Sequence, residues 1–309
     1  MEPLADEARS VALERVRSFL ARSDTSDFHS ADHFAESMLA EVRAAYEGSL
    51  ASPRAEAIIR RITKDIYTYY RLKDTSALAG EAAPVKFRFG GPDVRAIEFF
   101  DRQDRWFFSS FIDNRRQDVY DFFRREYLER GTRLFGRESP ESLDEFRKLV
   151  GGKLESINDR GVQTILRSSV QRIRNYAHIN QLAQARIYKL AKIIAIIDNR
   201  TTEICLHLDG KYIRLAAAAE AVDRLTRMDP GEYALELYKS AQGRAFAQNA
   251  VGYVEGRVHD DVVDDDLVAE GRGFPPYHPN CRTRVAAVLK GAPEPKSGAE
   301  QVAYDESQQ

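Results

Sequence analysis

Two short stretches of the chain hold side chains that could bind a metal ion. Cys205 and His207 lie two residues apart in the first stretch, and His278 and Cys281 form a His-x-x-Cys pair in the second. Thiolate and imidazole groups are the ligands that zinc takes in tetrahedral structural sites. These four residues therefore predict one zinc site, which would fasten the two stretches to each other.

A metal-free alternative uses the same two stretches. In that arrangement the cysteines are small buried apolar residues, and polar side chains hold the backbone through charge-assisted hydrogen bonds and turn caps. The residues that could do so are His278, Asn280, Asp198, Asp209, Arg200 and Arg282. The residues alone leave both versions open.

Motifs of catalysis are absent from the sequence. It contains no G-x-G-x-x-G, no Walker loop, no G-x-S-x-G and no H-E-x-x-H. Cys205 with His278 or His207 has the residue types of a nucleophile and a base, but no third group that would orient them is evident. We assign no catalytic residue, expect no small-molecule substrate, and predict that the chain is not an enzyme.

The elements that would position the zinc ligands are predicted from the flanking residues. A buried strand near Ile196, a polar turn and a second strand after Asp209-Gly210 are expected, because this dipeptide favours tight turns. Cys205 and His207 would then share one face of a strand. Val285 to Leu289 follows a proline-rich turn and is expected to close the sheet.

The whole chain is predicted to have an α+β fold that is mostly α-helical. Residues 1–150 read as a helical, aromatic-rich region, whose aromatics are typical of a core or a subunit interface. We expect a change of character at Gly151, followed by a unit of one long helix and a small β-sheet or hairpin over 151–291. The tail, 292–309, is polar and proline-containing and is predicted to be disordered.

Charge is segregated along the chain although the total is small. The net charge is -2 and the pI is about 6.4, so the global balance does not indicate nucleic-acid binding. The segment 160–192 nevertheless carries seven Arg or Lys residues and no Asp or Glu. Arg167, Gln171 and Arg174 lie along one helical face there, so Arg167 and Arg174 are candidates for contact with DNA, against the default of a solvated face.

Composition bounds the class of protein. Hydrophobic residues make up 43% of the 309 residues, and no run approaches the roughly 18 apolar residues of a membrane span. The N-terminus is acidic, so we expect no signal peptide and no membrane partner. Only two cysteines are present, which argues against a disulfide scaffold and for synthesis in a reducing cytoplasm.

The two stretches resemble a known family. D-x-R-T-x-x-x-C-x-x-L-D-G-K from Asp198, followed by P-P-x-H-P-N-C-R from Pro275, is similar to the C-terminal signature of the phage Mu F-like head-morphogenesis proteins. A helical stretch, 165–175, also resembles that family, although Arg167-Ser168-Ser169 stands where an R-T-E triplet is usual. Thr202 and Thr283 stand where many members have further cysteines.

The resemblance implies a minor capsid protein that acts structurally in assembly of the virion head. It implies portal or capsid proteins as partners, and location in the virion head or in the bacterial cytoplasm during assembly. The signature residues expected to hold the fold are Asp198, Arg200, Asp209, Gly210, Asn280 and Arg282, beside the candidate zinc ligands.

Two alternatives stay open at this point. A toxin or defence effector, including a metal-dependent nuclease, could reuse the same domain if the acidic run 260–266 converged with His259 or His278. A prophage remnant without a current role is the third reading.

Overall fold

The computed structural model describes most of the chain and divides it into two compact units. Unit 1 consists of residues 1–59 and 104–166, and unit 2 of residues 60–103 and 167–309. Each unit is therefore built from two separate segments, whereas the sequence predicted one division at residue 150. The described residues are 2–23, 27–78, 89–110, 112–134, 140–233, 251–278, 280–288 and 295–307.

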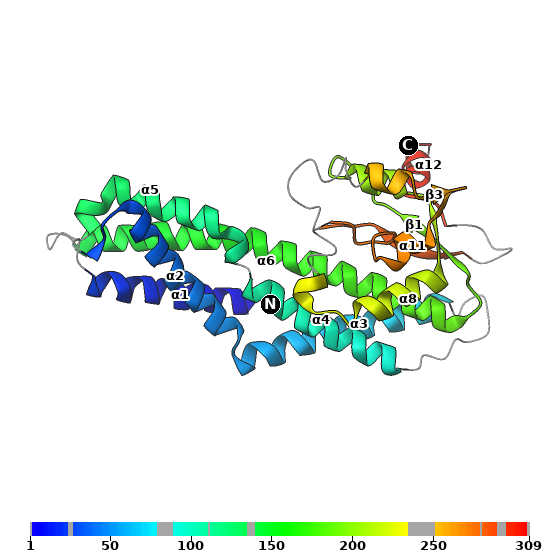
Figure 1. Cartoon of the computed structure of the whole chain (residues 1–309), viewed down its shortest axis with the longest axis horizontal. Helices are drawn as coiled ribbons and strands as arrows, with labels where there is room; N and C mark the ends of the chain where they lie inside the picture. Colours follow the sequence, from blue (N-terminus) through cyan, green and yellow to red (C-terminus); the bar gives the residue numbers. More distant parts are fainter. Residues whose placement is uncertain are drawn as a thin grey trace. The chain divides into compact units, whose positions relative to one another are not determined.

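Unit 1 is helical, and its core is aromatic. Helix α2 packs against both α1 and α5 (Figure 1). Phe34, Phe123 and Phe146 are fully buried and lie within aromatic contact distance of one another. Aromatic pairs at these separations stabilise a core by more than the burial of their apolar surface alone. The helices that contribute to this unit are α1 (Glu2–Arg22), α2 (Ala31–Leu50), α3 (Pro53–Leu78), α4 (Gly91–Ser109), the short 3-10 turn Asp113–Arg115, α5 (Arg116–Leu134) and α6 (Pro140–Ala185).

Helix α6 continues through Gly151 and Gly152, where the sequence predicted a change of character. Gly151 and Gly152 lie inside a single helix of 46 residues. A glycine in a helix interior costs only about 1 kcal/mol relative to alanine. The buried side chains of Val150 and Leu154 flank the glycines and anchor the helix in the core of unit 1, which outweighs that cost. The helix instead ends at Ala185, before the strand that follows.

Unit 2 holds a five-stranded mixed sheet in the order β3-β4-β2-β1-β5. The central strand β1 pairs antiparallel with β2 on one side and with β5 on the other, and β2 pairs with β4 in parallel. The prediction that the segment from Val285 closes the sheet is confirmed. The strands are β1 (Leu190–Ile194), β2 (Tyr212–Arg214), β3 (Val258–His259), β4 (Val262–Val263) and β5 (Arg284–Val288).

The two faces of β1 meet different partners. Ala191 and Ile193 point into the core of unit 2, and Lys192, between them, points to the other face, where it pairs with Glu300 at 3.3 Å. In Figure 1 the last helix accordingly lies on the side of the strands opposite α8 and α11. The remaining helices of unit 2 are α7 (Glu203–Leu208), α8 (Leu215–Leu225), α11 (Asp265–Ala269) and α12 (Gly298–Ser307).

The mostly helical α+β class predicted from the sequence is confirmed. Several aromatic residues of the N-terminal half, among them Phe99 and Phe122, are buried in the two cores, whereas Tyr69 and Phe89 are 55% and 44% exposed. Within the described part of the chain, no helix combines the length and apolar character of a membrane span.

A buried ion pair ties three helices of unit 2 together. Arg71 on α3 and Asp93 on α4 are both fully buried, and the guanidinium Nε donates to the carboxylate at 2.8 Å. Tyr67 also donates to Asp93, at 2.8 Å, while Gln181 and Gln184 of α6 accept hydrogen bonds from Arg71. Every charged atom of the pair therefore has partners, which a buried ion pair requires.

The C-terminal residues predicted to be disordered form α12. Ser297 and Glu300 make a capping box, in which each side chain accepts a hydrogen bond from the other residue's backbone N–H. Asp209 accepts two more, from the N–H groups of Gly298 and Ala299 at 2.8 and 2.9 Å. Composition alone pointed to disorder, but the S-x-x-E pattern of 297–300 is a helix-start signal and the signature aspartate completes it.

Substituting Gly298 tests this docking. An alanine Cβ at Gly298 would lie 2.1 Å from the carbonyl oxygen of Ala195, so α12 must move away from β1. We expect Gly298→Ala to lower the free energy of unfolding by roughly 1–3 kcal/mol, measured by urea titration. Gly252→Ala is the matched control, because nothing lies within 4 Å of its added Cβ. Equal stability of the two variants would contradict the docking of α12.

Candidate metal centre

Helix α7 carries the first candidate ligand, in place of the strand that the sequence predicted. Thr202 has extended backbone at the N-cap, and Ile204, Cys205 and Leu208 are the buried residues of the helix. Their i, i+1, i+4 spacing is that of one helical face, which was the signal available in the sequence. Gly210, with a φ of +81°, then turns the chain into β2, so the turn expected at Asp209-Gly210 is present.

Three of the four predicted zinc ligands lie together. Cys205, His278 and Cys281 each offer one ligand atom, and these atoms all lie within 4.8 Å of one another. The Cys205 Sγ is 3.8 Å from the Cys281 Sγ and 3.2 Å from the His278 Nε2. The two signature stretches, 76 residues apart at the cysteines, thus meet in unit 2 at a group that could hold a metal ion.

His207 does not belong to this group. Residues two apart on a helix point in nearly opposite directions, so His207 faces away from Cys205. Its Nδ1 lies 4.0 Å from a carboxylate oxygen of Glu255. The prediction of His207 as a ligand was therefore wrong, because it assumed a strand, where residues two apart share a face.

The spacing of the three donors fits zinc. Two sulfurs, each about 2.3 Å from a tetrahedral zinc ion, lie roughly 3.8 Å apart, which matches the observed separation. The cysteines are 3% and 2% exposed, as is usual for a structural ion and unsuited to a nucleophile that must reach a substrate. The protein supplies three ligands here, so the fourth position of a tetrahedral ion would need another donor.

The two threonines at the family's additional cysteine positions border this site. Thr202 Oγ1 is 3.0 Å from the His278 Nε2, and Thr202 and Thr283 both interact with the Cys205 thiol. The phenol of Tyr277 is fully buried beside the cysteines, and its oxygen has no hydrogen-bond partner among the described residues. A buried phenol without a partner is a ready donor to a metal-bound thiolate.

The two thiols have opposite protonation tendencies. The hydrogen bond to Cys281 raises the pKa of the Cys205 thiol, and burial raises it further. Burial alone would raise the pKa of Cys281 as well, but the hydrogen bonds from Cys205 and His278 outweigh it and lower that pKa well below its usual range. Cys281 is therefore the thiol that should lose its proton first when a metal ion binds.

An ion pair beside the cysteines joins the two stretches a second time. Both Asp198 oxygens accept hydrogen bonds from Arg282, at 2.6 and 2.7 Å, in the bidentate geometry of the strongest carboxylate pairs. The Arg282 hydrogen bonds hold the pKa of Asp198 well below its usual range. Arg200 adds a longer contact to Asp198, at 3.5 Å. This pair was among those the metal-free alternative predicted, and it coexists with the metal-ligand cluster.

The helical stretch with the family-like sequence contacts the second signature stretch. Ser168 accepts a hydrogen bond from the backbone N–H of Asn280 at 2.9 Å, and Asn280 has the left-handed φ of +59°. Gln171 and Asn175 both donate to the carbonyl oxygen of Thr283, at 2.6 and 3.3 Å. Three segments that were recognised separately in the sequence therefore contact one another in unit 2.

The comparisons with known proteins gave no match. No protein-family model matches the chain. No curated protein and no solved structure matches it either. The resemblance to the Mu F-like family consequently stays a prediction that depends on the three segments described above.

The acidic run does not form a second metal site. Asp261 pairs with Lys211, Asp264 with Arg257 and Asp265 with Arg214. Among the described residues, the Cys205, His278 and Cys281 group is the one cluster of candidate ligands, and it contains no carboxylate. The effector alternative thus lacks, in this part of the chain, the carboxylate and histidine convergence that a nuclease centre would need.

Proposed function

We propose that this chain is a minor head protein of a phage or prophage, acting as a structural component in assembly of the virion head. The observation that carries the proposal is the convergence of the three family-like segments on one buried site. Convergence is expected if the three segments together stabilise a single domain. Segments that matched the family pattern by chance would not be expected to contact one another.

In this proposal the site holds the fold and performs no chemistry on a substrate. Cys205, His278 and Cys281 hold a zinc ion, which pins the proline-rich turn before β5 onto α7. The Asp198–Arg282 pair and the Ser168–Asn280 hydrogen bond also hold this turn, the first from the stretch before α7 and the second from α6. Zinc is supported by the donor types and by the sulfur separation.

The partners in this proposal are portal or capsid subunits. Co-expressed with the portal protein encoded by the same genome, the full chain is expected to co-purify with it and to enter assembled heads. Immunoblotting of purified particles measures this directly. A chain that joins neither portal nor particles, and that stops growth of the expressing cells, would overturn the proposal and favour the effector alternative.

A further inference from the structure

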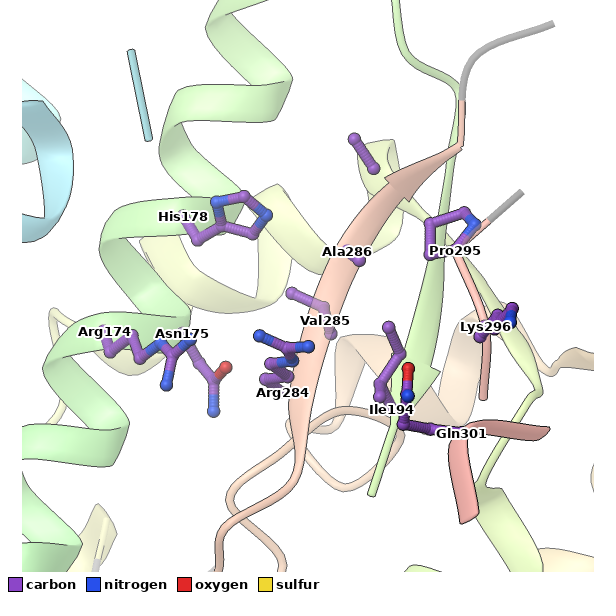
Figure 2. A pocket seen from close by; sticks show the side chains of 11 residues that line it. Arg174, Asn175, His178, Ile194, Arg284, Val285, Ala286, Pro295, Lys296 and Gln301 are labelled. Carbon is purple, nitrogen blue, oxygen red and sulfur yellow. The ribbon is translucent and has the colours of Figure 1, made fainter. Parts of the chain in front are cut away.

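A cavity of about 410 Å³ in unit 2 is lined by cationic and amide side chains. Arg174, Asn175 and His178 come from α6, Arg284 comes from β5, and Lys296 and Gln301 come from the C-terminal segment. Figure 2 shows the α6 residues on one side of β5 and the C-terminal residues on its other side. No Asp or Glu is among the lining residues.

The two arginines are held close together without a counter-ion from the described residues. Figure 2 shows Arg284 extending from β5 toward Arg174 and Asn175 on α6. Arg174 packs over the ring of Tyr70 at 5.6 Å, and neither guanidinium forms an ion pair with a carboxylate in the described part of the chain. Surrounding protein and the charge of Arg174 lower the pKa of Arg284, so the two groups repel each other.

The shape of the cavity suits a small anion. Ala286 and Ala287 of β5 contribute only methyl groups to the lining, which leaves space between the cations. Two guanidinium forks and an ammonium group supply at least three positive charges, and the amides of Asn175 and Gln301 add neutral polar groups. Such a set matches a multiply charged, multidentate oxyanion better than a single carboxylate.

We propose that the cavity between α6, β5 and the segment that leads into α12 is a phosphate-binding site, in which Arg174 and Arg284 clamp one phosphate group. The phosphate could belong to a DNA backbone or to a free phosphate ion, since the chemistry is shared. Arg167 lies seven residues before Arg174, on the same side of α6, and would extend the contact along a DNA strand. The site is distinct from the metal centre and independent of the portal role.

The test uses the full chain and a matched pair of double variants. Arg174→Gln with Arg284→Gln removes both clamps. Arg61→Gln with Arg227→Gln removes the same charge from residues that do not line the cavity and that pair with Asp65 and Asp223. Binding of a fluorescent 20-nucleotide DNA is measured by anisotropy at low salt, and binding of inorganic phosphate by calorimetry.

We expect the cavity variant to bind at least about tenfold more weakly and the control variant to bind within about twofold of the unmutated chain. A Lys pair at 174 and 284 should retain most of the binding, which separates loss of charge from loss of fold. Displacement of DNA by phosphate, or DNA binding alone, assigns the phosphate to a nucleic-acid backbone, and phosphate binding alone assigns it to the free ion. Equal affinity of the cavity and control variants, or no binding of either ligand, would overturn the proposal.

Discussion

Replacing Arg71 with methionine is expected to lower the free energy of unfolding by about 3–5 kcal/mol, one of the largest effects of any single substitution in this chain. The variant keeps Asp93 buried but removes its cation, and both side chains are 0% exposed. Hydrogen bonds from Tyr67 and the Gly90 N–H remain, but they do not neutralise the charge. The loss is measured by urea unfolding, monitored by far-UV circular dichroism.

Two further variants make this result interpretable. Arg61→Met lies on the same helix with its side chain 84% exposed, so its effect should stay within about 0.5 kcal/mol. Adding Asp93→Asn to Arg71→Met removes the buried carboxylate charge that the first substitution leaves without a cation. The double variant should therefore recover part of the lost stability. If Arg71→Met and Arg61→Met were equally stable, the ion pair would not contribute to the fold as described.

Removing the metal ligands is expected to have the second large effect. Purified chain should contain about one zinc per molecule, and Cys205→Ser or Cys281→Ser should lose it. At free zinc a hundred times the dissociation constant, binding to the folded state alone adds about 2.7 kcal/mol, and each variant forfeits that amount. Elemental analysis and thermal unfolding, with and without a chelator, measure the two losses together.

The pH dependence and a gain-of-ligand variant sharpen this test. Because the Cys205 thiol has a raised pKa, zinc must displace its proton, so zinc affinity should rise with pH by about tenfold per unit for each proton released. Thr202→Cys places a thiol beside His278, where it would be a candidate fourth ligand, and should tighten binding. The zinc prediction is contradicted if the unmutated chain contains no metal and is no more stable than the serine variants. The site would then be held by hydrogen bonds alone.

The sequence was most informative where a residue type carries chemistry that few others can supply. Cysteine and histidine are scarce here, so the meeting of Cys205 with His278 and Cys281 followed from their types and order. The strand from Arg284 and the turn at Asp209-Gly210 followed from local patterns. The strand and the turn depend on residues that are close in sequence, whereas the ligand group joins stretches 76 residues apart and was predicted from side-chain chemistry.

The errors arose where distant contacts decide the local structure. His207 was placed by assuming a strand, whereas burial of Ile204 and Leu208 in the core of unit 2 selects a helix. The tail read as disordered because its composition is polar, but its helix starts on Asp209, about 90 residues earlier in the chain. The division into units could not be read from residue 150, because each unit joins two separated segments.

The interleaving of the two units has a consequence for how the chain folds during synthesis. Unit 1 is complete once residue 166 has emerged, whereas residues 60–103 must wait for the second half of α6. About 90 residues separate Asp93 from Gln181 and Gln184, which is roughly 4–18 s at a typical 5–20 residues per second. We therefore expect Arg71 and Asp93 to stay hydrated through that interval and to lose their water only once the second half of α6 has been made. The rate of translation, as well as the packing of the finished chain, is therefore expected to determine the order in which the two cores form.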